Sequence, residues 1–255
     1  MTIVIENFEF YLLILVRITG FVYTAPFFSL KGVPFRVKTG LSIIMAMLVL
    51  LIIPYTPLEY TGVIGYSILL VKEAIVGVLM GFFTNIAYYI LNFAGQFIDM
   101  EIGFSMVSQL DPLTRIQTTI TSNLYSYLVM LIMLITNLHH HFLKAIVDSF
   151  QVVAVGKAII NPAMYQLMVK FMADYFIIGF RIVLPIFAAI LIVNTVLGIL
   201  AKIAPEMNMF VIGLQLKVFV GLFVMTLIIE LIPSVADFIF NEMIIMLKSI
   251  IEYLG

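Results

Sequence analysis

The chain is divided by apolar segments, several of them as long as a lipid bilayer is thick. A helix that crosses the hydrocarbon core needs roughly 20 mainly apolar residues. About six segments approach or exceed this length: 8–30, 39–53, 63–97, 116–138, 164–200 and 209–232. Hydrophobic residues make up 64% of the chain and charged residues 11%, whereas a soluble domain carries about 25% charged residues. The sequence therefore predicts an all-α, polytopic integral membrane protein with long, kinked helices, folded as one membrane domain over residues 1–255.

The connecting segments and the lengths of the apolar segments predict the membrane topology of the chain. The loop 31–38 carries three positive charges and no acid, so the positive-inside rule places it on the cytoplasmic side. The N-terminus lacks the basic region of a cleavable signal peptide, and we expect the first apolar segment to be retained. Segments 63–97 and 164–200 are too long for one crossing, which predicts either long tilted helices or broken ones. A short helix outside the span is expected within 137–161, and an amphipathic helix from Pro233 onward.

Composition and motifs argue against several classes of function. The chain has 13 basic and 14 acidic residues and no cysteine, which gives no support to nucleic-acid binding, a disulfide or a thiolate metal site. The motifs of nucleotide-binding proteins, zinc proteases and serine hydrolases are absent from the sequence. Consecutive side chains on a helix point about 100° apart, so the run His139–His141 is not expected to chelate one ion. We predict no enzyme activity, no metal and no cofactor.

The stretch 99–115 differs from every other part of the chain. Gly103 and the Asp111–Pro112 step are helix breakers, and apolar segments lie on both sides. Irregular backbone inside a membrane protein survives only where protein or a water-filled cavity surrounds it. We interpret the stretch as a loop that plugs a pore; simple core packing is the alternative.

The plug interpretation assigns two roles within the stretch. Methionine is unbranched and adapts to moving partners, and a hydrophobic constriction blocks ions by excluding water. The predicted constriction consists of Gly103, Phe104, Ser105, Met106 and Val107. The predicted anchors of the loop are Asp99, Glu101, Asp111, Pro112 and Arg115.

Ionisable residues also interrupt the apolar segments. Each costs at least about 2.5 kcal/mol at mid-bilayer, so each must reach a headgroup, form an ion pair or face a protein partner. The residues predicted to lie at a subunit interface or to be buried and polar are Arg17, Lys72, Glu73, Arg181, Lys202 and Lys217. The spacing Gly77-xxx-Gly81 lets two helix backbones approach closely, which predicts ordinary packing within the chain.

Four regions together resemble a known family, and they span nearly the whole chain in the family's order. They are Leu197–Gly213 with Leu216 and Lys217; Arg17 with Pro26, Pro34 and Arg36; Gly95–Gly103 leading to Asp111–Pro112; and Asn137–His139 through Val147–Phe150. The chain is similar to the FliR/SctT family of type III secretion export-gate subunits. Gln215, where many members carry proline, leaves the choice between the flagellar and the injectisome (virulence) system open.

The resemblance implies an assembly. Family members join FliP-like and FliQ-like membrane subunits in a channel for unfolded export substrates, with FlhB-like and FlhA-like export components nearby. It also implies a FliP-like half over residues 1–163 and a FliQ-like hairpin with an amphipathic end over 164–255, turning at Lys202–Asn208. The expected location is the bacterial inner membrane, in contact with lipid, at the flagellar basal body. A stand-alone secondary transporter, with Arg17, Lys72, Glu73 and Arg181 as a substrate site, is the alternative of another class.

Overall fold

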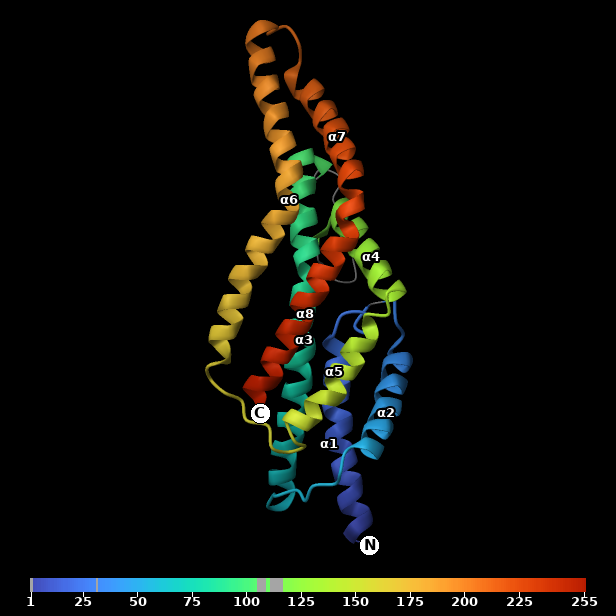
Figure 1. Ribbon diagram of the computed structural model, residues 1–255. Coiled ribbons are helices and arrows are strands. Elements are labelled where there is room, and N and C mark those ends of the chain that lie inside the picture. Colours follow the sequence, from blue (N-terminus) through green and yellow to red (C-terminus); the bar gives the residue numbers. More distant parts are fainter. Residues whose placement is uncertain (1, 31, 105–108, 111–116) are drawn as a thin grey trace. The chain divides into compact units, whose positions relative to one another are not determined.

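The computed structural model is all-α apart from one pair of two-residue strands (Figure 1). It describes residues 2–30, 32–104, 109–110 and 117–255, and the side chains of 8–30, 32–104 and 119–255. The elements are α1 (Thr2–Thr24), α2 (Phe35–Ile52), α3 (Gly62–Ile102), β1 (Gln109–Leu110), β2 (Gln117–Thr118), α4 (Ile120–Ile135), α5 (His139–Val152), α6 (Met164–Ile203), α7 (Met209–Ile228), the 3₁₀ turn η2 (Ile229–Leu231) and α8 (Ile232–Leu254). The predicted all-α, polytopic fold is confirmed.

The two longest apolar segments each form one helix. α3 has 41 residues and α6 has 40, so each is about 60 Å long at 1.5 Å per residue. This is roughly twice the thickness of the hydrocarbon core, and parts of both helices must lie outside it. Pro185 lies within α6, where its ring removes one backbone hydrogen bond without ending the helix.

Several helices are suited to cross a membrane. Among the described residues, α2, α3, α6 and the continuous run Met209–Leu254 are long and apolar enough, and the bent pair α4–α5 is a fifth candidate. These five candidate spans are one fewer than the six apolar segments of the sequence, because α1 is not among the candidates. At most 33% of the residues in the most apolar window of these four are buried within the chain. Lipid or other proteins must therefore cover the remainder.

The helices are grouped in two compact units. Unit 1 comprises Met1–Ala87, Leu134–Val169 and Ile239–Gly255, and unit 2 comprises Tyr88–Met133 and Lys170–Phe238. Because α3, α4, α6 and α8 contribute to both units, neither unit is a continuous piece of sequence. The predicted division of the chain near residue 163 remains a prediction.

In unit 1, α1 and α3 pack with their backbones in direct contact. A Cβ atom on Gly77 would overlap the carbonyl oxygen of Arg17, and one on Gly81 would overlap Thr24. From the other side, a Cβ on Gly20 would lie 3.0 Å from the carbonyl oxygen of Ala74. Small residues permit this approach, as in other membrane helix pairs. The prediction that Gly77 and Gly81 serve internal packing is confirmed.

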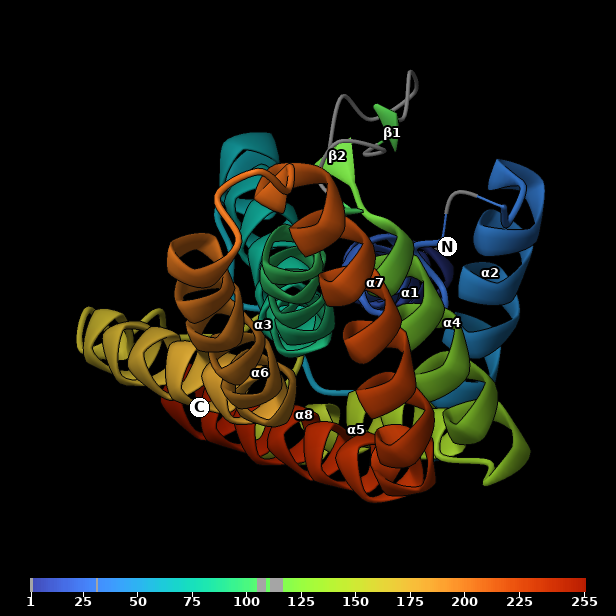
Figure 2. The same cartoon turned by 90° about the horizontal axis from the view of Figure 1, so that it is seen from above.

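In unit 2, α6 and α7 form an antiparallel hairpin, seen side by side in Figures 1 and 2. The turn occupies residues 204–208, within the stretch where the sequence predicts it. The side chain of Asn208 caps α7 by accepting a hydrogen bond from the Val211 amide at 3.4 Å. Gly213 of α7 faces Leu197 of α6, and a Cβ there would lie 3.1 Å from the leucine side chain.

The C-terminal helix α8 is amphipathic, as predicted. Asp237, Asn241, Lys248 and Glu252 are exposed. The buried stripe includes Ala236, Ile239, Met243, Leu247 and Ile250. The sequence pattern also places Phe238 on the apolar face of this helix, but the side chain is 40% exposed.

Candidate functional site

The stretch with the unusual charge pattern begins inside a helix. α3 continues to Ile102, so Asp99 and Glu101 lie on its last turn instead of in irregular backbone. Gly103 ends the helix with φ +98°, and its amide donates to the carbonyl oxygen of Asp99 at 3.0 Å. This backbone region is open to glycine and strained for other residues. The predicted break at Gly103 is confirmed.

Asp99 joins the two ends of the connection between α3 and α4. Its side chain is fully buried. One carboxylate oxygen accepts a hydrogen bond from the Thr121 amide at 2.9 Å, and the other accepts a short one from the Thr121 hydroxyl. Thr121 is in the first turn of α4, where backbone N–H groups lack partners within the helix. The carboxylate of α3 therefore caps α4 and favours its positive end electrostatically.

Next to this cap, α3 and α4 touch backbone to backbone. A Cβ on Gly95 would overlap the backbone of Ser122. The Ser122 hydroxyl donates to the carbonyl oxygen of Asn92 at 2.9 Å, and the Tyr88 hydroxyl donates to that of Ser126 at 3.0 Å. These bonds bind α4 along three turns of α3, so the root of the connection is fixed.

The connection itself contains one described element. β1 and β2 pair in an antiparallel register, with Gln109 opposite Thr118 and Leu110 opposite Gln117. Gly103, Phe104 and Glu101 are half-buried at the end of α3. The predicted constriction residues Ser105, Met106 and Val107 and the predicted anchors Asp111, Pro112 and Arg115 lie outside the described residues.

A second polar site lies in unit 1. Arg17 of α1 and Glu73 of α3 are both fully buried and form a two-pronged ion pair. The Nε atom of Arg17 donates to Oε2 of Glu73 at 2.5 Å, and Nη2 donates to Oε1 at 2.9 Å. The guanidinium carbon also lies 4.2 Å from the centroid of the Phe150 ring. The planar fork of arginine suits both contacts.

The same ion pair holds the backbone that follows α5. Nη1 of Arg17 donates to the carbonyl oxygen of Val153 at 2.9 Å, and Oε1 of Glu73 accepts from the Gly156 amide at 2.7 Å. Gly156 has φ +78°, where glycine is favoured. Non-helical backbone inside a membrane protein needs such internal partners. Arg17 and Glu73 thus connect three segments that are far apart in the sequence.

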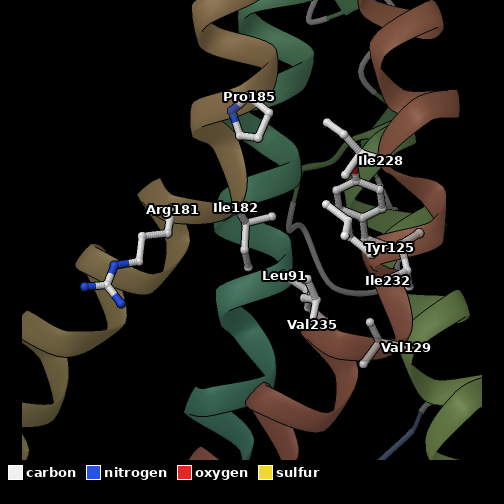
Figure 3. Close-up of a pocket in the computed structure, with 10 residues that line it drawn as sticks. Leu91, Tyr125, Val129, Arg181, Ile182, Pro185, Ile228, Ile232 and Val235 are labelled. Carbon is white, nitrogen blue, oxygen red and sulfur yellow. The ribbon is translucent and has the colours of Figure 1, made fainter.

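The other cations predicted at polar or interface positions differ in exposure. Lys72 and Lys217 are half-buried, whereas Arg181 and Lys202 are exposed. Among the described residues, the ion pair between Arg17 and Glu73 is the one that these predicted residues form. Arg181 lies at the edge of an apolar cavity of unit 2 (Figure 3).

The side chains of His139, His140 and His141 make contacts between aromatic rings. The rings of His139 and His140 lie 4.2 Å apart, and His141 meets the edge of Phe240 at 5.5 Å. Within the described part of the chain, no three His, Asp or Glu side chains converge in a way that could hold a metal ion.

Sequence reasoning did not find the partners of these sites. The sequence assigns no contact with Arg17, Glu73 or Asp99 to Thr121, Val153, Gly156 or Phe150, because Val153 and Gly156 contribute through the backbone and Phe150 through its ring face. The signal that the sequence does contain is the Gly–Lys step after Val155, which marks the end of the α5 segment, and the hydroxyl-rich start of α4.

Comparison with known proteins identifies the family. The model of the family described as "Bacterial export proteins, family 1" matches residues 8–243. The chain belongs to this family. Both the ion pair and the cap at Asp99 lie within the matched residues.

Individual members of the export family match over most of their length. The flagellar biosynthetic protein FliR of Bacillus subtilis (strain 168) is 30% identical over 259 residues, covering 100% of this chain and 99% of the relative. The FliR of Escherichia coli (strain K12) is 28% identical over 242 residues, covering 94% and 92%. That of Aquifex aeolicus (strain VF5) is 26% identical over 216 residues, covering 85% and 83%.

Proposed function

We propose that the chain is a subunit of the flagellar protein export gate in the bacterial inner membrane, at the flagellar basal body. The observation that carries the proposal is the full-length match to relatives named as flagellar biosynthetic proteins, within a family of export proteins. The mainly exposed surfaces of its apolar helices support a place inside a larger membrane assembly. In this proposal the subunit acts by forming a channel and performs no enzymatic step.

The proposed partners are FliP-like and FliQ-like membrane subunits, with FlhB-like and FlhA-like components on the cytoplasmic side. The channel passes unfolded export substrates. The proposed seal is the loop after α3, with Gly103, Phe104, Ser105, Met106 and Val107 as the constriction. Support comes from Gly103, which ends α3 with φ +98°.

The proposed anchor of that seal is Asp99. A loop that moves to open and close a channel must stay attached at both ends. Asp99 holds these ends together, because it joins the last turn of α3 to the first turn of α4. A buried carboxylate that caps a helix makes stronger hydrogen bonds than a neutral group would. Glu101, Asp111, Pro112 and Arg115 are proposed as further contacts between the loop and the channel wall.

The proposed roles of the cations follow from their burial. Arg17 and Glu73 act inside the subunit, where they fix the segment after α5. Lys72, Arg181, Lys202 and Lys217 are exposed or half-buried, and their charges need partners beyond the subunit, either protein or lipid.

The test of the channel proposal is a deletion of residues 103–108 in cells that also make the FliP-like and FliQ-like subunits. We expect the deletion to make the membrane permeable to ions, measured as a current or as loss of the membrane potential. Asp99→Ala should produce a smaller leak, and Glu101→Ala, the matched acid two residues away, a still smaller one. Unchanged conductance in the deletion, with the complex still assembled, would remove the plug from the proposal.

The test of the assembly is purification. The export-gate proposal requires two different small membrane proteins to co-purify with the tagged chain. Recovery as a monomer or small homo-oligomer would favour a stand-alone transporter instead. Recovery with injectisome components would assign the chain to a virulence system.

A further inference from the structure

An apolar cavity lies within unit 2 where α6 contains its proline. Its volume is about 100 Å³, and its walls come from α3, α4, α6 and the region where α7 passes into α8. Figure 3 shows Leu91, Tyr125 and Val129 facing residues of α6 and α8 across it. The lining is almost wholly hydrocarbon. An engineered apolar cavity of about 150 Å³ holds a benzene molecule, so this one suits a short stretch of an acyl chain.

A cation stands at the rim of this cavity. The Arg181 stem contributes to the wall, while its guanidinium group points away from the other lining residues (Figure 3). The side chain is exposed, and the described residues offer it no ion pair. Pro185, which has no N–H, also deprives the Arg181 carbonyl of its usual helical donor. An unpaired guanidinium in an apolar helix requires an anionic or hydrated partner.

The position of Arg181 along α6 indicates what that partner is. Residues 182–201 are 20 consecutive residues without a charge, and Arg181 and Lys202 stand at the two ends of this segment. At 1.5 Å per residue the segment is about 30 Å long, which equals the thickness of the hydrocarbon core. If this segment is the part of α6 that crosses the bilayer, Arg181 lies at the level of the lipid headgroups.

The second helix of the hairpin, α7, leads to the same position of the cavity relative to the membrane. Arg181 precedes the end of α6 at Ile203 by 22 residues, and Leu231 follows the start of α7 at Met209 by 22 residues. Leu231 also lines the cavity. Beside it in the sequence, Glu230 is exposed, as expected for an acid at a membrane interface. Both helices thus place the cavity just below the headgroup region.

We propose that the cavity and Arg181 together form a phospholipid site. The phosphate of the headgroup pairs with the Arg181 guanidinium, which suits phosphate because of its forked geometry. Part of one acyl chain enters the cavity between α3, α4 and α6. An anionic lipid such as phosphatidylglycerol is favoured over a zwitterionic one, since its net charge matches the unpaired cation. The site does not depend on the proposed export function.

The test uses the full-length chain, purified with the subunits that co-purify with it, and native mass spectrometry. Dioleoyl phosphatidylglycerol and dioleoyl phosphatidylcholine are added in equal amounts, and the retained lipids are counted. We expect one phosphatidylglycerol to be retained in preference. Arg181→Gln should lower its retention about fivefold, the effect of about 1 kcal/mol per basic residue near a lipid surface, and Arg181→Lys should retain more than Arg181→Gln.

Two further variants separate the cavity from the charge. Val129→Phe, or Val235→Phe if the first does not fold, fills the cavity and should lower retention although Arg181 is intact. Lys202→Gln removes the cation at the other end of the charge-free segment, where no residue of the cavity lies, and should lower retention less than Arg181→Gln does. The soluble headgroup glycerophosphoglycerol should not displace the lipid, because it has no chain to fill the cavity.

Two results would overturn the proposal. The first is equal retention by the wild type and Arg181→Gln; if a co-purifying subunit is lost at the same time, Arg181 is assigned to a protein contact. The second is equal retention of the two lipids by the wild type.

Discussion

Removing the carboxylate of Glu73 tests how the buried ion pair stabilises unit 1. In Glu73→Met the guanidinium of Arg17 stays fully buried without its counter-ion, and the Gly156 amide loses its acceptor. Breaking a buried pair by removing one partner costs about 3–5 kcal/mol. With about 2–4 °C per kcal/mol for a chain of this size, the unfolding midpoint should fall by roughly 6–20 °C.

The magnitude can be divided by a double-mutant cycle. Arg17→Met leaves the carboxylate buried, while Arg17→Met/Glu73→Met leaves no buried charge. The double variant still loses the hydrogen bonds to Val153 and Gly156, each worth about 1–3 kcal/mol when a buried group is left unpaired. Because the double variant leaves no unpaired charge buried, whereas each single variant does, we expect it to lose less stability than the two single variants together, by about 0.5–3 kcal/mol.

The measurement is the temperature at which half of the protein is lost from its size-exclusion peak after heating in detergent. The chain has no tryptophan, so a fluorescent protein fused to the C-terminus reports the elution. Lys72→Met, at the half-buried neighbour of Glu73, is the control and should shift the midpoint by less than 3 °C. Additive losses in the cycle, or a shift as small as the control's in Glu73→Met, would refute the reasoning.

Three other substitutions test the helix contacts. Asp99→Ala removes the cap of α4 and should cost about 1–2 kcal/mol, with faster proteolysis between α3 and α4 than in Glu101→Ala. Gly77→Ala places a methyl group against the Arg17 carbonyl and should cost about 1–3 kcal/mol in heat stability; Gly198→Ala, which faces open space in α6, should be neutral or stabilise by up to about 1 kcal/mol. Gly103→Ala is strained at φ +98° and should cost about 1–3 kcal/mol, whereas an unchanged midpoint would show that α3 can end differently.

The helices could be predicted from the sequence because apolar length and helix breakers determine them. The turn between α6 and α7, the end of α3 at Gly103 and the amphipathic character of α8 all follow from local residues. The choice between a long helix and a broken one could not be made for 63–97 or 164–200. Pro185 is equally compatible with a kink in the helix and with the end of the helix. That α6 continues through Pro185 depends on packing against other segments, which the local sequence does not contain.

The sites could be predicted only in part. Arg17, Glu73 and Asp99 stand out because a charge in an apolar segment is costly, and all three are buried. Their backbone partners could not be derived, because the Val153 carbonyl and the amides of Gly156 and Thr121 are groups that nearly every residue has. The sequence pattern also predicts that the helix ends before Asp99, whereas α3 continues to Ile102 and the Asp99 side chain caps α4 at Thr121.

The low burial of the run from α7 to α8, where 11% of the most apolar window is covered by the chain itself, has a consequence for how cells make this protein. Where neighbouring proteins cover this run, their binding stabilises it, and that stabilisation depends on their concentration. Copies made in excess of their partners are expected to be degraded, because quality control removes chains that stay incompletely folded. Balanced synthesis of the chain and its partners would then set how many complete assemblies a cell contains.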